Sequence, residues 1–173
     1  MTNEPSVHAS AVLVGDRAVL IRGPSGSGKS RLAFDLILAG RTGQIARAVL
    51  VGDDRVHLEA SGGQLLARPA HQLAGLIEIR GLGIRSCDFV SEAVVGLVVD
   101  LAAADADRLP PPEALRTQVN GIFLPRIPVN AGCAPLPLVI AALTMSAISS
   151  SPQPSADCSK GIGNHISPTL ATE

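Results

Sequence analysis

The sequence predicts one α/β domain in which a phosphate-binding loop joins a buried strand to an amphipathic helix. Two observations support this: GPSGSGKS at 23–30 lies between the apolar run AVLIR and RLAFDLILAG, and an acidic segment, VLVGDDRV, follows at 49–56. The chain has 173 residues and is 46% hydrophobic, which is enough for one core. We predict a domain over 1–148 and, because few apolar residues follow, a disordered tail over 149–173.

Composition argues against several classes of partner. The net charge is −1, and the chain has three Phe and no Trp or Tyr, so neither charge nor base stacking favours nucleic acid. No apolar run is long enough to span a bilayer, and MTNEPSVHAS lacks the features of a secretory signal. Three widely spaced cysteines form no zinc pattern. We therefore expect a cytoplasmic protein that binds neither nucleic acid nor a membrane.

The first part of the chain is predicted to form a hairpin, the loop and a helix. In SAVLVGDRAVLIRG, at 10–23, two apolar runs flank a Gly-Asp pair, which is typical of a hairpin turn. After the loop, four apolar residues within 32–37 recur at helical spacing. This spacing predicts a helix over about Ser30–Ala39 that stops at Gly40.

The rest of the chain is predicted to contain mainly strands. ARAVLVGDDRVHLEA at 46–60 indicates one strand with two aspartates near its middle, and GQLLARP at 63–69 indicates another. AVVGLVVDL at 93–101 indicates a buried strand. After a proline-broken loop, the prolines of GIFLPRIPVN at 121–130 limit it to a sheet edge or an irregular segment. The apolar segment at 136–148 predicts a final helix.

The glycine-rich segment matches the G-x-x-x-x-G-K-[ST] pattern in full. Glycines allow backbone N–H groups to turn toward an anion, and the N-terminus of the following helix adds further donors. Lys29 is expected to reach the β- and γ-phosphates of ATP, and the Ser30 hydroxyl to ligate Mg²⁺. We therefore predict a nucleotide-binding site made of Gly23, Pro24, Ser25, Gly26, Ser27, Gly28, Lys29 and Ser30.

Asp53 and Asp54 are the second candidate for chemistry. In nucleotide enzymes with such a loop, a later acidic motif supplies a carboxylate associated with magnesium. Neighbouring side chains of a strand point to opposite faces, so one aspartate can face the metal and the other a substrate hydroxyl. A solvated pair of acids in a turn would show the same spacing. The residues alone do not decide between these interpretations, nor which aspartate has which role.

Three blocks resemble the catalytic domain of bacterial HPr kinase/phosphorylase: GPSGSGKS, LVGDDRV and LIEIRGLGI, in that order. VHAS and DADRLP are also similar to patterns of that family. The resemblance covers about 7–143 and implies a short form without the family's N-terminal domain. It implies a P-loop kinase domain of the phosphoenolpyruvate carboxykinase-like type. The implied activity is ATP-dependent phosphorylation of a serine on HPr, or on a nitrogen-branch relative, together with the reverse attack of phosphate on phosphoserine.

The resemblance also implies roles for individual residues. They are His8 before the first strand, Lys29 and Ser30 as loop lysine and magnesium ligand, Asp53 or Asp54 as the base, Glu78 as a metal ligand and Arg108 as a catalytic arginine. These roles make physical sense, because a positioned carboxylate can accept the proton of a weakly nucleophilic serine hydroxyl. Cationic side chains and Mg²⁺ can neutralise charge on the transferring phosphoryl group.

The sequence departs from the family pattern in three places. RTGQIAR at 41–47 lengthens the link between helix and strand, and we expect a surface loop there. Asn130 and Cys133 stand where a lysine and an arginine are expected, which weakens the expectation of phosphorylase activity unless Arg108 and Arg126 compensate. The last helix is short, so a homo-oligomer is allowed while the family's hexamer is less expected.

Two alternatives belong to other classes. A small-molecule kinase with a phosphate loop usually carries an arginine-rich lid, whereas Arg116 and Arg126 are isolated in this sequence. A degenerate, non-catalytic nucleotide-binding sensor is consistent with the altered segment PVNAGCAP. Transfer of labelled γ-phosphate to HPr distinguishes a kinase from a module that only binds.

Overall fold

The computed structural model describes residues 5–146, so the tail expected over 149–173 lies outside the described residues. In chain order the elements are β1 Ser6–Val7, β2 Ser10–Val14, β3 Arg17–Arg22, α1 Lys29–Arg41, β4 Ala48–Gly52, β5 Val56–Ser61, β6 Gln64–Pro69, the 3-10 turn η1 His71–Leu73, β7 Leu76–Ile79, β8 Gly83–Ser86, β9 Ala93–Leu101, β10 Arg116–Val119, β11 Ile122–Val129 and α2 Pro135–Thr144.

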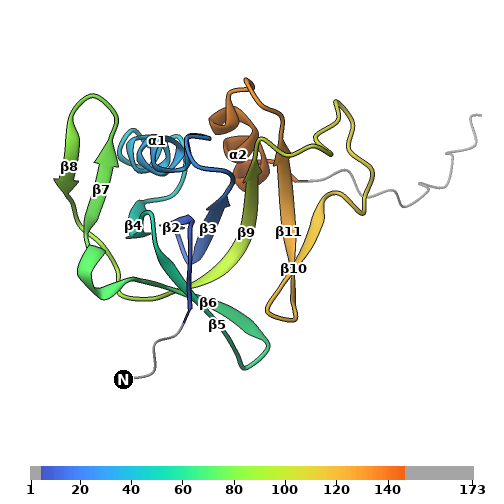
Figure 1. Ribbon diagram of the computed structural model, residues 1–173. Coiled ribbons are helices and arrows are strands. Elements are labelled where there is room, and N and C mark those ends of the chain that lie inside the picture. The colour runs from blue at the N-terminus through green and yellow to red at the C-terminus, as the bar shows by residue number, and fades with distance from the viewer. Residues whose placement is uncertain (1–4, 147–173) are drawn as a thin grey trace, which may run out of the picture.

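Nine of the strands form one curled sheet, which both helices cover on the same side (Figure 1). The strand order is β1-β5-β6-β9-β3-β2-β4, with β11 beside β9 and β10 beside β11. The central strand β3 runs parallel to β9, which in turn runs parallel to β11. β7 and β8 pair only with each other within the described residues, and this hairpin lies beside α1 (Figure 1).

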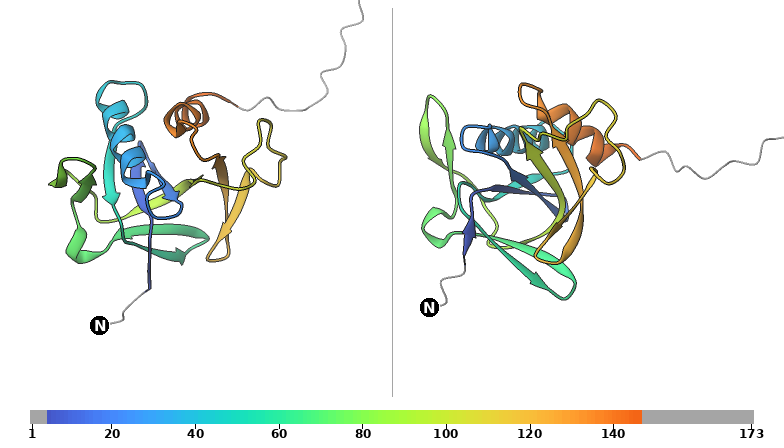
Figure 2. Two further views of the ribbon diagram at one scale, coloured as in Figure 1. Left: turned by 45° about the horizontal axis from the view of Figure 1, so that its top comes forward. Right: turned by 45° about the vertical axis from the view of Figure 1, so that its right-hand side comes forward.

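Residues 5–146 form two apolar cores, one on each side of the sheet. Val19 and Ile21 of β3 belong to the core under the helices, whereas Ala18 and Leu20 belong to the core on the opposite side. This alternation follows from the two-residue repeat of a strand. Figure 2 shows the curl of the sheet, and the second core takes its residues mainly from strands β2 to β6, from β9 and from β11. A strand that is buried on both faces must be apolar throughout, as the run in β3 is.

The predicted hairpin and helix are confirmed, with one correction. β2 and β3 pair in register from Ser10↔Ile21 to Val14↔Arg17. The helix α1 does not stop at Gly40 but continues to Arg41. Gly40 has another role, because a Cβ there would lie 2.6 Å from the backbone nitrogen of Ala48. The glycine therefore lets α1 pack closely on β4, and the helix ends two residues later than its sequence suggests.

The prediction of one strand over 46–60 is wrong. β4 ends at Gly52 and β5 begins at Val56, and the two aspartates lie in the turn between them. β4 pairs with β2, while β5 pairs with β1 and β6 at the far end of the sheet, so the chain must change direction here. Asp54 makes this change with a φ of 66°. The segment before β4, 41–47, is exposed apart from Ile45, which is buried in the core under the helices.

The buried strand predicted at 93–101 is confirmed as β9, whereas the predicted edge position of the segment at 121–130, which contains β11, is corrected. β11 lies between β9 and β10 rather than at an edge, but it changes partner along its length: Pro125 pairs with β10, and Pro128 pairs with β9. Each proline therefore has a strand on one side only, where a missing N–H is tolerated. The final helix is confirmed as α2, with Pro135 in its first turn. Within residues 5–146 no helix is long and apolar enough to cross a membrane.

Candidate active site

The glycine-rich loop connects the end of β3 to the start of α1, as predicted. Gly23 has a φ of 151°, and a Cβ there would lie 2.6 Å from Ser27 Oγ and 2.9 Å from the carbonyl oxygen of Leu101. Only glycine therefore lets the loop lie so close to the end of β9. Gly28 is left-handed, with a φ of 97°, and its carbonyl accepts a hydrogen bond from Leu32 N at 2.9 Å. The loop thus wraps directly into the helix N-terminus.

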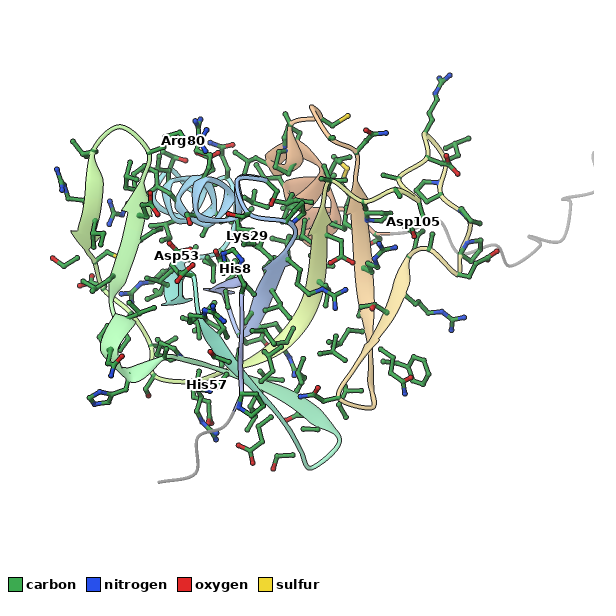
Figure 3. All side chains as sticks on the ribbon, viewed as in Figure 1. His8, Lys29, Asp53, His57, Arg80 and Asp105 are labelled. Atoms are coloured by element: carbon green, nitrogen blue, oxygen red, sulfur yellow. The ribbon has the colours of Figure 1, made fainter. Side chains whose placement is uncertain are left out.

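Lys29 lies buried inside this loop. Its Nζ donates to the carbonyl oxygens of Gly23 and Pro24, both at 3.0 Å, and only 6% of the residue is exposed. Burial lowers the pKa of Lys29, and the negative charges of Asp53 and Asp54 oppose that effect. Figure 3 shows His8, Lys29 and Asp53 together below α1.

The loop fits a phosphate group and its magnesium ion. Ser27 Oγ is buried and has no hydrogen-bond partner among the described residues, so it can donate to a bound anion. Mg²⁺ in kinases is usually held by one or two carboxylates together with phosphate oxygens and water. Residues 5–146 contain no group of three or more His, Cys, Asp or Glu side chains that could hold a metal. The Ser30 hydroxyl and the Glu78 carboxylate are the protein groups that could do so.

Asp53 has both of its carboxylate oxygens occupied. Oδ1 accepts a hydrogen bond of 2.5 Å from the buried Ser10 Oγ, and Oδ2 accepts one of 3.1 Å from the backbone N–H of Glu78. Asp53 is only 3% exposed. A buried carboxylate needs such donors to remain charged. Asp53 therefore ties the end of β4 to β2 on one side and to β7 on the other.

Asp54 has a very different environment. Its side chain is 62% exposed, and Oδ1 lies 3.2 Å from His8 Nε2. Asp54 also has a left-handed backbone conformation, with a φ of 66°. The two aspartates do differ, as expected, but a sharp turn separates them rather than the alternation of a strand.

Glu78 and His8 reach the site from outside the central strands. Glu78 is exposed on β7, and its backbone N–H is fixed by Asp53. His8 lies between β1 and β2, two residues before Ser10. The structure thus brings together His8, the loop lysine, both aspartates and the strand that carries Glu78.

The structure does not bring Arg108 to this site. Arg108 is exposed in the loop over 102–115, which projects beyond β11 on the side away from β4 and β7 (Figure 1). Asp105 of the same loop is held by two hydrogen bonds from Arg126, at 2.6 and 2.9 Å. Asp105 also lies well away from Lys29 and Asp53 in Figure 3. A catalytic role for Arg108 stays a prediction.

Arg126 belongs to a chain of ion pairs beside the phosphate loop. Its Nε donates to Asp100 Oδ2 at 2.5 Å, and Arg22 donates to both oxygens of Asp100 at 2.7 and 2.8 Å. Burial raises the pKa of Asp100, but the hydrogen bonds from the two arginines outweigh it and hold that pKa below its usual value. Since Arg22 precedes Gly23 directly, this chain of charges fixes the base of the loop to β9 and β11.

Sequence reasoning missed Ser10, Arg22 and Asp100. Ser10 carries a weak signal, because it follows His8 by two residues and so belongs to the same short segment before the hairpin. Arg22 and Asp100 are 78 residues apart, and only the parallel pairing of β3 with β9 places them side by side.

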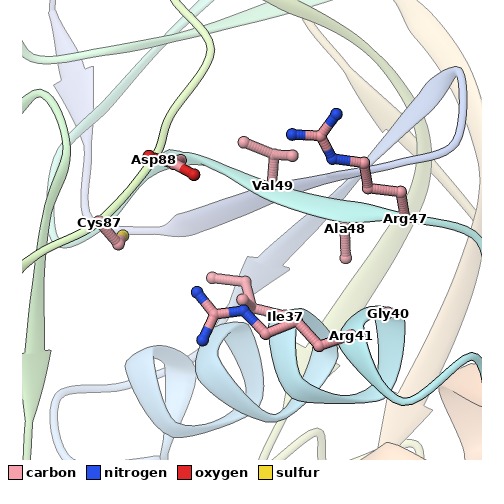
Figure 4. A pocket seen from close by; sticks show the side chains of 8 residues that line it. All are labelled: Ile37, Gly40, Arg41, Arg47, Ala48, Val49, Cys87 and Asp88. Carbon is pink, nitrogen blue, oxygen red and sulfur yellow. The ribbon is translucent and has the colours of Figure 1, made fainter.

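A cavity of about 150 Å³ lies at the other end of α1 (Figure 4). Residues that line it include Ile37, Gly40, Arg41, Arg47, Cys87 and Asp88. Burial raises the pKa of the Cys87 thiol, and the charge of Asp88 adds to the effect. None of the residues predicted to act on phosphate lines this cavity, so the chemistry belongs to the loop and not to this cavity.

Comparison with known proteins agrees with this geometry. The profile of the HPr Serine kinase C-terminal domain matches residues 1–151. The HPr kinase/phosphorylase of Mycoplasma mycoides subsp. mycoides is 30% identical over 160 residues, which are 84% of this chain and 49% of that protein. That of Streptococcus pneumoniae (strain Hungary19A-6) is 35% identical over 148 residues, covering 76% of this chain and 44% of that protein. The chain spans about half the length of these curated relatives.

The structure of the Hpr(Ser) kinase/phosphatase from Coxiella burnetii is also similar, with a TM-score of 0.63 and 28% identity. The match covers 80% of this chain and 93% of that one. Fold and loop together define a P-loop domain of the kinase type. The chain belongs to the family of HPr serine kinase C-terminal domains. The family resemblance and the fold class predicted from the sequence are thereby confirmed.

Proposed function

We propose that this domain transfers the γ-phosphoryl group of ATP to a serine hydroxyl of an HPr-type phosphocarrier protein, either HPr or a nitrogen-branch relative. The observation that carries this proposal is the difference in burial and hydrogen bonding between the two aspartates beside the loop. Asp53 is buried with both oxygens occupied, whereas Asp54 is exposed next to His8. An exposed carboxylate can meet the hydroxyl of a macromolecular substrate, and a fully bonded one cannot.

Asp54 acts as the general base in this proposal. It accepts the proton of the serine hydroxyl while the serine oxygen bonds to the γ-phosphorus and the bond from that phosphorus to the β-phosphate oxygen breaks. His8 orients Asp54 through its Nε2, at 3.2 Å. A proton, a phosphoryl group and ADP are thus accounted for, and no further reactant is needed.

The loop supplies the charge that the transfer requires. The ammonium group of Lys29 has three N–H donors. Two of them donate to the carbonyls of Gly23 and Pro24, so one remains for a phosphate oxygen. Ser30 and Glu78 would hold magnesium, which would neutralise phosphate charge when bound. The chemistry proposed here does not use Arg108, which is exposed in the same loop as Asp105. A cytoplasmic location and self-association stay predictions.

Incubation with HPr and Mg-ATP, followed by mass spectrometry of HPr, tests the proposal. We expect one added phosphoryl group on a serine, formed more slowly with K29A by on the order of 10²-fold or more. R31A is the matched control, because Arg31 lies on the same helix but is exposed and pairs only with Asp35 among the described residues. Nucleotide binding without any transfer would support the sensor module instead.

A further inference from the structure

Ser10 is a buried polar residue to which none of the roles above is assigned. It is 0% exposed, and its hydroxyl donates to Asp53 across 43 residues of sequence. Ser10 begins β2, which lies between β3 and β4 in the sheet. A hydroxyl at such a position is tolerated only when it is paired, and its partner is the aspartate that holds Glu78.

An irregularity in the sheet creates this pairing. Val12 pairs with Leu50, but Ala11 pairs with Gly52, so Val51 is an extra residue in β4. Bulges of this kind re-aim side chains next to active sites. With the bulge, Asp53, which follows Gly52, falls opposite Ser10, which precedes Ala11. Asp53 and Ser10 therefore meet where the ladder ends.

The same short segment holds both aspartates. His8 contacts Asp54, and Ser10, two residues later, contacts Asp53. Because the segment before β2 and the segment after β4 run antiparallel, the earlier residue, His8, meets the later aspartate, Asp54. The His-Ala-Ser segment thus fixes each aspartate in a separate direction.

We propose that Ser10 is a positioning residue, which acts through Asp53 to fix both the Asp53–Asp54 turn and the backbone of Glu78 for phosphoryl transfer. The proposal rests on the proposed kinase function. Without the Ser10 hydroxyl, Asp53 Oδ1 is left buried without a donor. Asp53 then rotates toward other donors such as Lys29, and its bond to the Glu78 N–H is lost.

Two measurements on the full chain test this with S10A, S10T and the control S61A, in which an exposed serine at the end of β5 is changed. Hydrogen exchange of the Glu78 amide should be faster in S10A, with exchange in β9 unchanged. The kcat for HPr phosphorylation should fall on the order of tenfold, matching a coupling energy of about 1.4 kcal/mol. KM for ATP should stay within about twofold in the same variant. S10T and S61A should behave as wild type in both measurements.

The outcomes separate the two proposals. Unchanged Glu78 exchange in S10A, or a kcat close to wild type, overturns the role of Ser10. If S10A does not fold, S10T decides: wild-type exchange and kcat support the role, and loss of either overturns it. If wild-type protein transfers nothing to HPr, the kinase proposal fails, and the role of Ser10 in phosphoryl transfer fails with it. The exchange result then decides only whether Ser10 holds Glu78 through Asp53.

Discussion

Replacing each aspartate separately by asparagine should give opposite results in two assays. D54N removes the proposed base, so kcat should fall by about 10²–10⁴-fold, the usual range for general base catalysis. Its effect on stability should be small, because the side chains of Asp54 and His8 are 62% and 41% exposed. Exposed ion pairs of this kind contribute roughly 0–1 kcal/mol.

D53N should act mainly on stability. An asparagine at this position can still accept from Ser10 through its oxygen, but its NH₂ group then faces the N–H of Glu78. Two buried donors facing each other leave an unmet hydrogen bond, which costs about 1–3 kcal/mol. For a domain of this size such a loss lowers Tm by roughly 3–10 °C.

The assay pairs thermal unfolding with the initial rate of HPr phosphorylation at saturating Mg-ATP. The matched control is D35N, since Asp35 is a partly exposed aspartate on α1 that pairs with Arg31. A D54N protein that keeps wild-type turnover would refute the assignment of the base. A D53N protein with unchanged Tm would refute the claim that both oxygens of Asp53 hold the fold together.

Three further outcomes follow from the structure. K29A should lose on the order of 10²-fold or more in kcat, as expected when one electrostatic stabiliser is removed, and a folded variant with near-normal turnover would contradict the role of the lysine. R126A should lower the free energy of unfolding by about 1–3 kcal/mol at pH 7, because Asp100 would keep only Arg22 as a charged partner. The pKa of Asp100 is lowered in the folded protein, so this contribution is fully present above an unfolded pKa of about 4 and disappears as pH falls below it. Denaturant titrations of wild type and R126A should therefore converge in acid, and a constant gap down to low pH would be inconsistent with the pairing. Pyrophosphate release from phosphorylated HPr and inorganic phosphate should be slower than the forward reaction, because Asn130 and Cys133 carry no charge to hold a second anion. Equal rates in the two directions would show that basic residues at these positions are dispensable.

Local patterns were sufficient to predict the part of the fold that carries the loop. The hairpin before Gly23, the amphipathic face of α1 and the apolar run of β9 are each determined by residues close in sequence. The break between β4 and β5 could not be predicted in this way. Gly52, Asp53 and Asp54 are poor strand formers, but the apolar residues on both sides of them favoured one strand, and the turn is explained by the different partners of β4 and β5.

The site was predictable only to the extent that its chemistry lies in motifs. Lys29, Asp53 and Asp54 belong to recognisable segments, and Lys29, Asp53 and the partner of Asp54, His8, lie together in Figure 3. The role of Ser10 could not be predicted, because its position two residues after His8 is only a weak signal and its partner depends on a bulge at Val51. Arg126 is isolated in the sequence and was considered a candidate to bind phosphate. In the fold its donors go to Asp100, Asp105 and the carbonyl of Ala114.

The ion pairs that Arg126 makes with Asp100 and Asp105 also affect the electric field at the loop. Arg22 and Arg126 alternate with Asp100 and Asp105, so two positive charges are balanced by two negative ones. The field of a neutral group falls off faster with distance than that of a single charge, so these arginines attract an incoming phosphate weakly. The attraction comes from Lys29, the loop N–H groups and the dipole of α1, opposed by the nearby aspartates. Such a balance favours an anion that arrives with its own cation, as a metal-bound nucleotide does, over one that arrives bare.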